Sequence, residues 1–187
     1  MTNGLINVAI FLISTIFSLY AFIVLLRFFL QWVKADFYNP VSQMIMKATN
    51  VVVMPLRRVV PGFFHLDWSC IVVVYFIFLI ENLLVGLLKG YGLDLLFIFV
   101  KPLLDMPFAI INMFVYLIVI RAIASWFIHG GYNPIFVAIF QITEPLLSRV
   151  RRFIKPTAAG FDFSPIVVLI VLFCVQIFLQ SVIAEIF

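Results

Sequence analysis

One pattern of residues occurs twice in this chain, as RFFLQWVKADFYNP at residues 27–40 and as RAIASWFIHGGYNP at residues 121–134. Each copy has an arginine, a tryptophan five residues later and an Asn-Pro pair in the same register. Matches in such uncommon residue types, in the same order, are the mark of an internal repeat. The sequence therefore indicates two tandem copies of one structural unit.

The similarity between the copies continues beyond this pattern. A shift of 94 residues (121 minus 27) keeps them aligned through an Arg-Arg pair, and one extra residue near Lys155 restores the alignment further on. We select the repeated residues as candidates for structural or interaction roles. They are Arg27, Trp32, Asn39, Pro40, Thr49, Arg57, Arg58 and Asp67 in the first copy, and Arg121, Trp126, Asn133, Pro134, Thr143, Arg151, Arg152 and Asp162 in the second.

The composition is that of a membrane protein. Of the 187 residues, 66% are hydrophobic and 11% are charged, whereas a soluble domain has about 45–50% apolar and about 25% charged residues. Four apolar windows approach the roughly 20 residues that cross a bilayer as a helix. We predict an all-α membrane protein of four transmembrane helices in two repeats. The helices are expected at about 5–33, 68–88, 106–128 and 164–187, and the repeats at 1–95 and 96–187.

Each repeat also predicts a shorter helix that begins at its Asn-Pro pair. The asparagine can cap the first turn, and the proline already has the φ angle of a first helical residue. Apolar residues then recur at three- and four-residue spacing over about 40–54 and 134–147. Such helices are too short to span a bilayer, so we expect them to lie in its interface. Because each copy contains two spans, the copies are expected to be parallel.

The basic residues predict the orientation in the membrane. Lysine and arginine in short connections favour the cytoplasmic side, and they concentrate after the first and third predicted spans. We therefore expect both short helices in the cytoplasm and both termini outside. The Arg-Arg pairs are also candidates for contact with anionic lipid headgroups. We expect no nucleic-acid partner, because the basic residues are not clustered beside groups that stack on or bind bases.

Arg27 and Arg121 lie a turn or more inside the predicted interface, where the repeated tryptophans are expected to mark the headgroup level. A guanidinium at that depth must extend to the interface or find a partner. The nearest carboxylates in the repeat are Asp67 and Asp162, so we predict ion pairs Arg27 with Asp67 and Arg121 with Asp162, or the crossed pairs between copies. Extension of the arginines to the headgroups is the alternative.

The order Arg-x4-Trp-x6-Asn-Pro-x8-Thr, followed by Arg-Arg and Asp-x-Ser in both copies, resembles the YggT family, also called YlmG. The resemblance covers nearly the whole chain, and its two-repeat form resembles members from proteobacterial inner membranes. It implies an inner-membrane protein, so the termini that the basic residues place outside would be periplasmic. It implies no established activity. Its implied associations are cell-division gene neighbourhoods, osmotic stress tolerance and, through plastid relatives, nucleoid arrangement and assembly of a cytochrome complex.

The inventory of reactive side chains is poor, so we expect neither an enzyme nor a cofactor. The histidines, His65 and His129, lie in predicted loops at positions that do not correspond between the copies. Neither has a cysteine or carboxylate at the spacing of a metal site. Cys70 and Cys174 also do not correspond, and their expected depths argue against a disulfide.

Three polar side chains are predicted inside the membrane: Glu81, Asn112 and Gln176, the last being the repeat partner of Glu81. Intramembrane ionisable residues often mark a path for an ion. Interhelical hydrogen bonds are the alternative, each contributing on the order of 0.6 kcal/mol. Four helices leave little room for an aqueous pore, so conduction would require a homo-oligomer.

The repeated residues concentrate at the predicted cytoplasmic interface rather than at mid-membrane, which favours interaction over transport. We therefore expect a non-catalytic scaffold or assembly factor that acts through this interface, with the lipid bilayer and a membrane or division protein as partners. An oligomeric ion channel or transporter that contributes to osmotic stress tolerance is the alternative.

Overall fold

A computed structural model describes residues 2–60, 62, 66–90, 95–127, 133–153 and 162–186. These residues form six helices, and four of them are long and apolar enough to cross a membrane. The chain is thus an all-α, multi-pass membrane protein, as predicted. The long helices are α1 (Thr2–Trp32), α3 (Trp68–Lys89), α4 (Leu95–Phe127) and α6 (Ser164–Ile186), and the short ones are α2 (Pro40–Arg57) and α5 (Pro134–Arg151).

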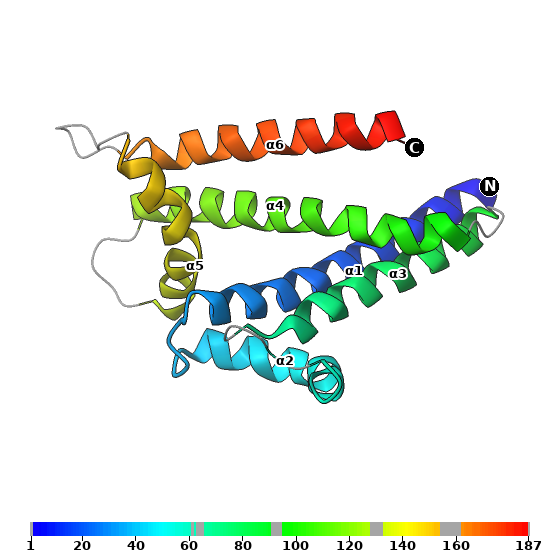
Figure 1. Ribbon diagram of the computed structural model, residues 1–187, viewed down its shortest axis with the longest axis horizontal. Helices are drawn as coiled ribbons and strands as arrows, with labels where there is room; N and C mark the ends of the chain where they lie inside the picture. Colours follow the sequence, from blue (N-terminus) through cyan, green and yellow to red (C-terminus); the bar gives the residue numbers. More distant parts are fainter. Residues whose placement is uncertain are drawn as a thin grey trace.

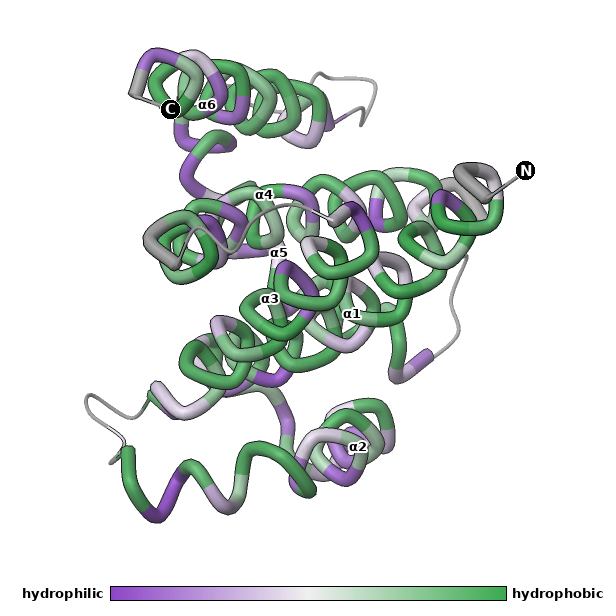
Figure 2. Tube along the Cα trace, turned by 90° about the vertical axis from the view of Figure 1, so that its right-hand side faces the viewer, coloured by the Kyte–Doolittle hydropathy of each residue, from purple (hydrophilic) through white to green (hydrophobic). Residues whose placement is uncertain are grey.

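The long helices run between two distinct ends of the molecule. Both termini lie at one end, which we call the termini end, and α5 crosses the long helices at the opposite end, where α2 also begins (Figure 1). We call this second end the α2/α5 end. Figure 2 shows that hydrophobic residues predominate on the long helices. Four spans of this kind require both short helices to lie on the same side of a membrane.

Helix α4 begins earlier than the sequence predicted. It starts at Leu95 rather than near residue 106, and it contains Pro102 and Pro107. The helix is longer than predicted because Lys101, Pro102 and Asp105 interrupt the apolar run without ending the helix. The charges are instead paired within the helix, since Lys101 Nζ lies 2.7 Å from an oxygen of Asp105 one turn away, and such pairs stabilise helices.

The core forms where α1, α3 and α4 meet, and α2 and α5 close it at one end. Its fully buried side chains include Val24, Leu25, Val74, Met113 and Ile118. A buried aromatic contact joins the two copies, because the rings of Phe29 and Phe114 meet edge-on with centroids 4.9 Å apart. The first-copy spans α1 and α3 are therefore packed tightly together and against α4.

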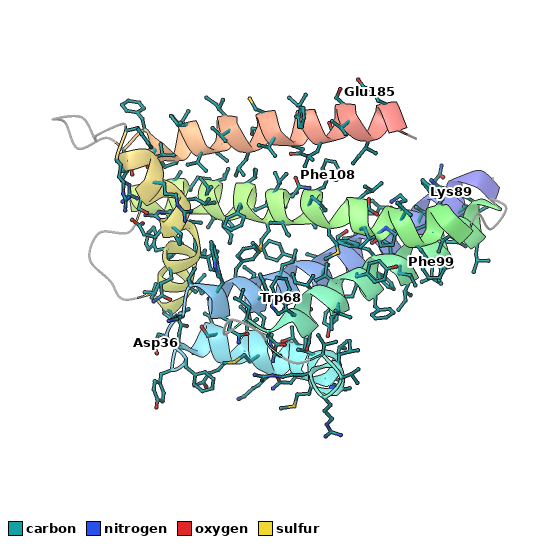
Figure 3. All side chains as sticks on the ribbon, viewed as in Figure 1. Asp36, Trp68, Lys89, Phe99, Phe108 and Glu185 are labelled. Carbon is teal, nitrogen blue, oxygen red and sulfur yellow. The ribbon has the colours of Figure 1, made fainter. Side chains whose placement is uncertain are left out.

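Helix α6 is packed differently from its counterpart α3. It contacts only α4 and α5 among the described elements, and 6% of its apolar window is buried, against 22% for α3. Its side chains project freely on the side away from α4 (Figure 3). The two copies thus share their elements but not their packing, and most of α6 is left to contact lipid.

Candidate functional site

The Asn-Pro pairs begin the short helices, which confirms the predicted caps. The Oδ1 atom of Asn39 accepts a hydrogen bond from the Val41 backbone N–H at 2.8 Å. Asn133 makes the same contact with the Ile135 N–H at 3.0 Å. In each case the following proline occupies the first helical position, where its missing N–H costs nothing.

Asn39 has a second role that Asn133 is not seen to share within the described residues. Its Nδ2 atom donates a hydrogen bond to the backbone carbonyl of Pro134 at 2.8 Å, and only 1% of Asn39 is exposed. This bond joins the start of α2 to the start of α5. The two copies are therefore tied together at the point where their short helices begin.

Arg27 is buried and binds groups from α2 and from the start of α3. Its Nη1 atom donates to Oγ1 of Thr49 at 2.9 Å and to Oδ1 of Asn50 at 2.8 Å. Its Nη2 atom lies 3.8 Å from an oxygen of Asp67. The predicted pair of Arg27 with Asp67 is thus confirmed, and we name Arg27, Thr49, Asn50, Arg57 and Asp67 the first charged cluster.

Arg121 occupies the equivalent position in the second copy but has a different acidic partner. It donates to Oγ1 of Thr143 at 2.8 Å and binds Glu144 at 2.6 Å. Its predicted pairing with Asp162 is wrong. Glu144 directly follows Thr143, which already contacts Arg121, so the Glu144 carboxylate lies next to the Arg121 guanidinium. Asp162 binds Arg151 instead, at 2.9 Å.

Arg151 completes the second charged cluster, which consists of Arg121, Thr143, Glu144, Arg151 and Asp162. Its Nη1 atom lies 3.0 Å from Glu144 while its Nε donates to Asp162. The network therefore runs from α4 through α5 to Asp162, two residues before α6 begins. It holds the short helix against both spans of its copy.

The two arginines of each Arg-Arg pair have separate surroundings. The first arginine of each pair lies beside carboxylates, since Arg57, although 55% exposed, is 3.7 Å from Asp67 and Arg151 binds two carboxylates. The second ones, Arg58 and Arg152, are exposed. The sequence gives no reason to separate the two arginines of a pair. In the described part of the structure, only the second arginine of each pair forms no ion pair and is therefore available to a partner.

Asn50 and Glu144 are site residues that sequence reasoning did not select. They occupy the same repeat position, directly after the repeated threonine. Arg27 binds the neutral amide, whereas Arg121 and Arg151 share the carboxylate. The sequence could have pointed to these two residues, because they differ in charge at a position where the neighbouring residues of the two copies match.

The surroundings of Asp162 predict a response to acid. Burial raises the pKa of Asp162, but hydrogen bonds from Ser164 and the nearby Arg151 charge outweigh it, so its pKa lies below the ordinary 3.8. The folded chain then binds this proton less readily than the unfolded chain. Its stabilising contribution is complete above about pH 4 and is lost as the pH falls further.

We therefore expect the melting temperature of the wild-type chain in detergent to fall more steeply between about pH 5 and pH 3 than that of Asp162→Asn. The difference in slope should be that of one carboxylate that takes up a proton on unfolding. The measurement is a melting curve at each pH, monitored by circular dichroism. Parallel curves for the two proteins would contradict the prediction.

The remaining repeated aromatic residues are only partly placed. Trp32 ends α1, is 40% exposed and packs edge-on against Phe29. Trp126 lies in α4, and its side chain is outside the described residues, as are His65 and His129. Among the residues that the structure does describe, no group of three histidine, cysteine or acidic side chains could hold a metal ion.

Two of the three predicted intramembrane polar residues come together. Glu81 and Asn112 line a cavity of about 830 Å³ between α1, α3 and α4, together with Ser14 and Ser18. Asp105 lines it too, and it accepts a hydrogen bond from Asn82 at 3.1 Å. Gln176 does not line this cavity, and its buried Oε1 has no partner among the described residues.

The comparison with known proteins agrees with this duplicated architecture. The model of the family described as CCB3/YggT matches the chain twice, over residues 6–88 and 100–183. The chain belongs to the CCB3/YggT family. Each YggT match ends within the second span of its copy, so the family unit corresponds to one span, one short helix and a second span.

Bacterial relatives cover most of the chain. A Pseudomonas aeruginosa protein is 38% identical over 165 residues, which is 87% of this chain and 83% of the relative. The Escherichia coli K12 protein named YggT is 33% identical over 170 residues, or 91% of this chain and 88% of the relative. A Vibrio alginolyticus protein is 38% identical over 165 residues, or 86% of each. The relatives' names assign no activity, and no solved structure matches significantly.

Proposed function

We propose that this YggT-family chain is a non-catalytic scaffold or assembly factor of the bacterial inner membrane, which acts through its α2/α5 end. The observation that carries the proposal is the use made of the repeated polar residues. Arg27, Arg57, Arg121 and Arg151 are bound to groups of the same chain. They hold two short helices at one end of the membrane spans, where an outward face is available to a partner.

That outward face combines apolar and basic side chains. On and after α2, Met44, Val51, Met54 and Val59 are all more than half exposed. Arg58, after α2, and Arg152, after α5, are exposed as well. Because basic residues favour the cytoplasmic side, we place this end in the cytoplasm and both termini in the periplasm. A membrane or division protein that presents acidic residues beside an apolar surface would suit it.

The test uses the division of roles within the Arg-Arg pairs. Arg58→Ala combined with Arg152→Ala should lower partner recovery about thirtyfold, as expected when two interfacial charges worth roughly 1 kcal/mol each are removed. Recovery is measured by crosslinking and pull-down from native membranes. The melting temperature should stay unchanged. Lys89→Ala, at the termini end, is the matched control and should recover partners normally. Unchanged recovery in the double variant would argue against the scaffold.

A second candidate function is ion transport by an oligomer, and the cavity lined by Glu81 and Asn112 favours it. A carboxylate inside a membrane segment is costly unless it is paired or serves an ion. Cation flux into reconstituted vesicles that is lost in Glu81→Gln and retained in Glu185→Gln would favour transport over the scaffold. Absence of flux in the wild-type chain would exclude this candidate.

A further inference from the structure

A second cavity, of about 410 Å³, lies in the first copy beside its charged cluster. Its lining includes Arg27, Lys34 and Arg57 as cations and Asp67 as an anion. Three positive charges and one negative charge leave a net charge of +2. Among the described residues Lys34 forms no ion pair, and Arg57 is 55% exposed with Asp67 at 3.7 Å. An excess of positive charge around a cavity favours an anionic ligand.

Two residues that line the same cavity carry buried polar atoms that lack partners. Ser42 is 5% exposed and Asp67 is 2% exposed. The hydroxyl of Ser42 and the Oδ1 atom of Asp67 have no hydrogen-bond partner within the described part of the chain. Buried polar groups in folded proteins are nearly always satisfied. A ligand would satisfy these two by accepting a hydrogen bond from Ser42 and donating one to Asp67.

The second copy shows what the first one lacks. Ser42 and Met46 correspond to Phe136 and Phe140, and Asn50 corresponds to Glu144. The ring of Phe140 packs against the Arg121 guanidinium, 4.7 Å from its centroid. The Glu144 carboxylate binds both arginines of its cluster, whose two cations and two anions give a net charge of zero. The second copy therefore supplies internally both the bulk and the negative charge that are missing from the first.

The depth of the cavity matches that of lipid headgroups. Helix α1 has 31 residues, which corresponds to about 46 Å at 1.5 Å per residue, whereas the hydrocarbon core is about 30 Å thick. The helix is therefore longer than the hydrocarbon core is thick. Its one charged residue, Arg27, lies near its C-terminal end, so we expect the last turns of α1 to extend beyond the hydrocarbon. Lys34 lies just after α1, and apolar Leu30 and Phe37 line the cavity beside it.

We propose that this cavity binds an anionic phosphate ester, and that its source is a membrane lipid whose headgroup carries a hydroxyl, of the phosphatidylglycerol class. Lys34 and Arg57 bind the phosphate oxygens, which also accept the Ser42 hydroxyl proton. A headgroup hydroxyl donates to Oδ1 of Asp67. The phosphate takes the role in the first copy that the Glu144 carboxylate has in the second. This site does not depend on the scaffold function.

Two variants test the site without straining the fold. Lys34 has a φ of 52°, a left-handed conformation that glycine adopts more readily, so Lys34→Gly removes the charge while relieving the backbone. Asn50→Glu reproduces the carboxylate of the second copy. Each variant should weaken phosphatidylglycerol binding at least tenfold in a native mass spectrometry titration of the purified chain. Lys47→Gln, which removes an equal charge from an exposed position outside the cavity, should stay within twofold of wild type.

Two arms of the experiment distinguish the sources of phosphate. A lipid site requires that phosphatidylglycerol binds more tightly than phosphatidylcholine and that inorganic phosphate does not raise the melting temperature. If inorganic phosphate raises it in the wild type and not in Lys34→Gly, the phosphate site stands with a soluble ligand. The proposal is overturned if neither ligand binds selectively, if Asn50→Glu binds like wild type, or if Lys47→Gln loses as much affinity as Lys34→Gly.

Discussion

Arg27→Met is expected to lower the free energy of unfolding by about 3–5 kcal/mol, the usual cost of removing one partner from a buried ion pair. The methionine fills similar space but leaves the Asp67 carboxylate, 2% exposed, without its buried counter-ion. The remaining cation, Arg57, is 3.7 Å away and more than half exposed. Thr49 and Asn50 lose their hydrogen-bond donor as well.

The matched control is Arg121→Met, which should cost only about 1–2 kcal/mol, because a pair whose carboxylate is half exposed contributes much less than a fully buried one. Glu144 is 45% exposed and keeps Arg151 as a partner at 3.0 Å. Both free energies can be measured by unfolding in mixed micelles with increasing denaturing detergent. Equal losses, or a larger loss in Arg121→Met, would show that the first charged cluster is not the tighter support.

Asn39→Ala is expected to cost about 2–3 kcal/mol, the sum of a lost helix cap of about 1 kcal/mol and a lost buried hydrogen bond of about 1–2 kcal/mol. Both groups of the Asn39 amide are used, one on the Val41 N–H and one on the Pro134 carbonyl. Because the second bond joins the copies, its loss should also loosen α2 from α5. Hydrogen exchange of both short helices should increase.

Within the described residues the Asn133 side chain makes only the cap contact, so Asn133→Ala is expected to cost about 1 kcal/mol. Asn39→Asp separates the two roles of Asn39, because the carboxylate can still cap α2 but cannot donate to Pro134. It should therefore loosen the contact between copies while α2 remains helical. If Asn39→Ala and Asn133→Ala are equally damaging, the bond between the copies contributes nothing measurable.

The two predictions share a theme, which is that duplicated residues acquire unequal roles. Arg27 and Arg121 come from matching positions, yet one binds a neutral amide and the other a carboxylate. Asn39 and Asn133 both cap, yet only Asn39 is seen to reach the other copy. One difference between equivalent positions, such as Asn50 in the first copy and Glu144 in the second, changes the net charge of a whole cluster. The repeat therefore supplies a frame in which each copy can specialise.

Local chemistry made the main elements predictable from the sequence alone. A run of about 20 apolar residues must cross the bilayer as a helix, because the hydrocarbon leaves backbone groups no other partners. An Asn-Pro pair starts a helix through contacts within two residues, so Asn39 and Asn133 were readable as caps. The family followed from the same repeated residues, since their order is a property of the chain.

Tertiary structure decided which charges meet and how tightly the copies pack. Glu144 rather than Asp162 binds Arg121, because the choice depends on distances between helices that spacing along the chain does not give. The length of α4 depended on charges that pair once the helix has formed. Apolar residues on α3 and α6 look alike in sequence, yet only α3 is buried against α1, because hydrophobicity is non-directional and specifies no neighbour.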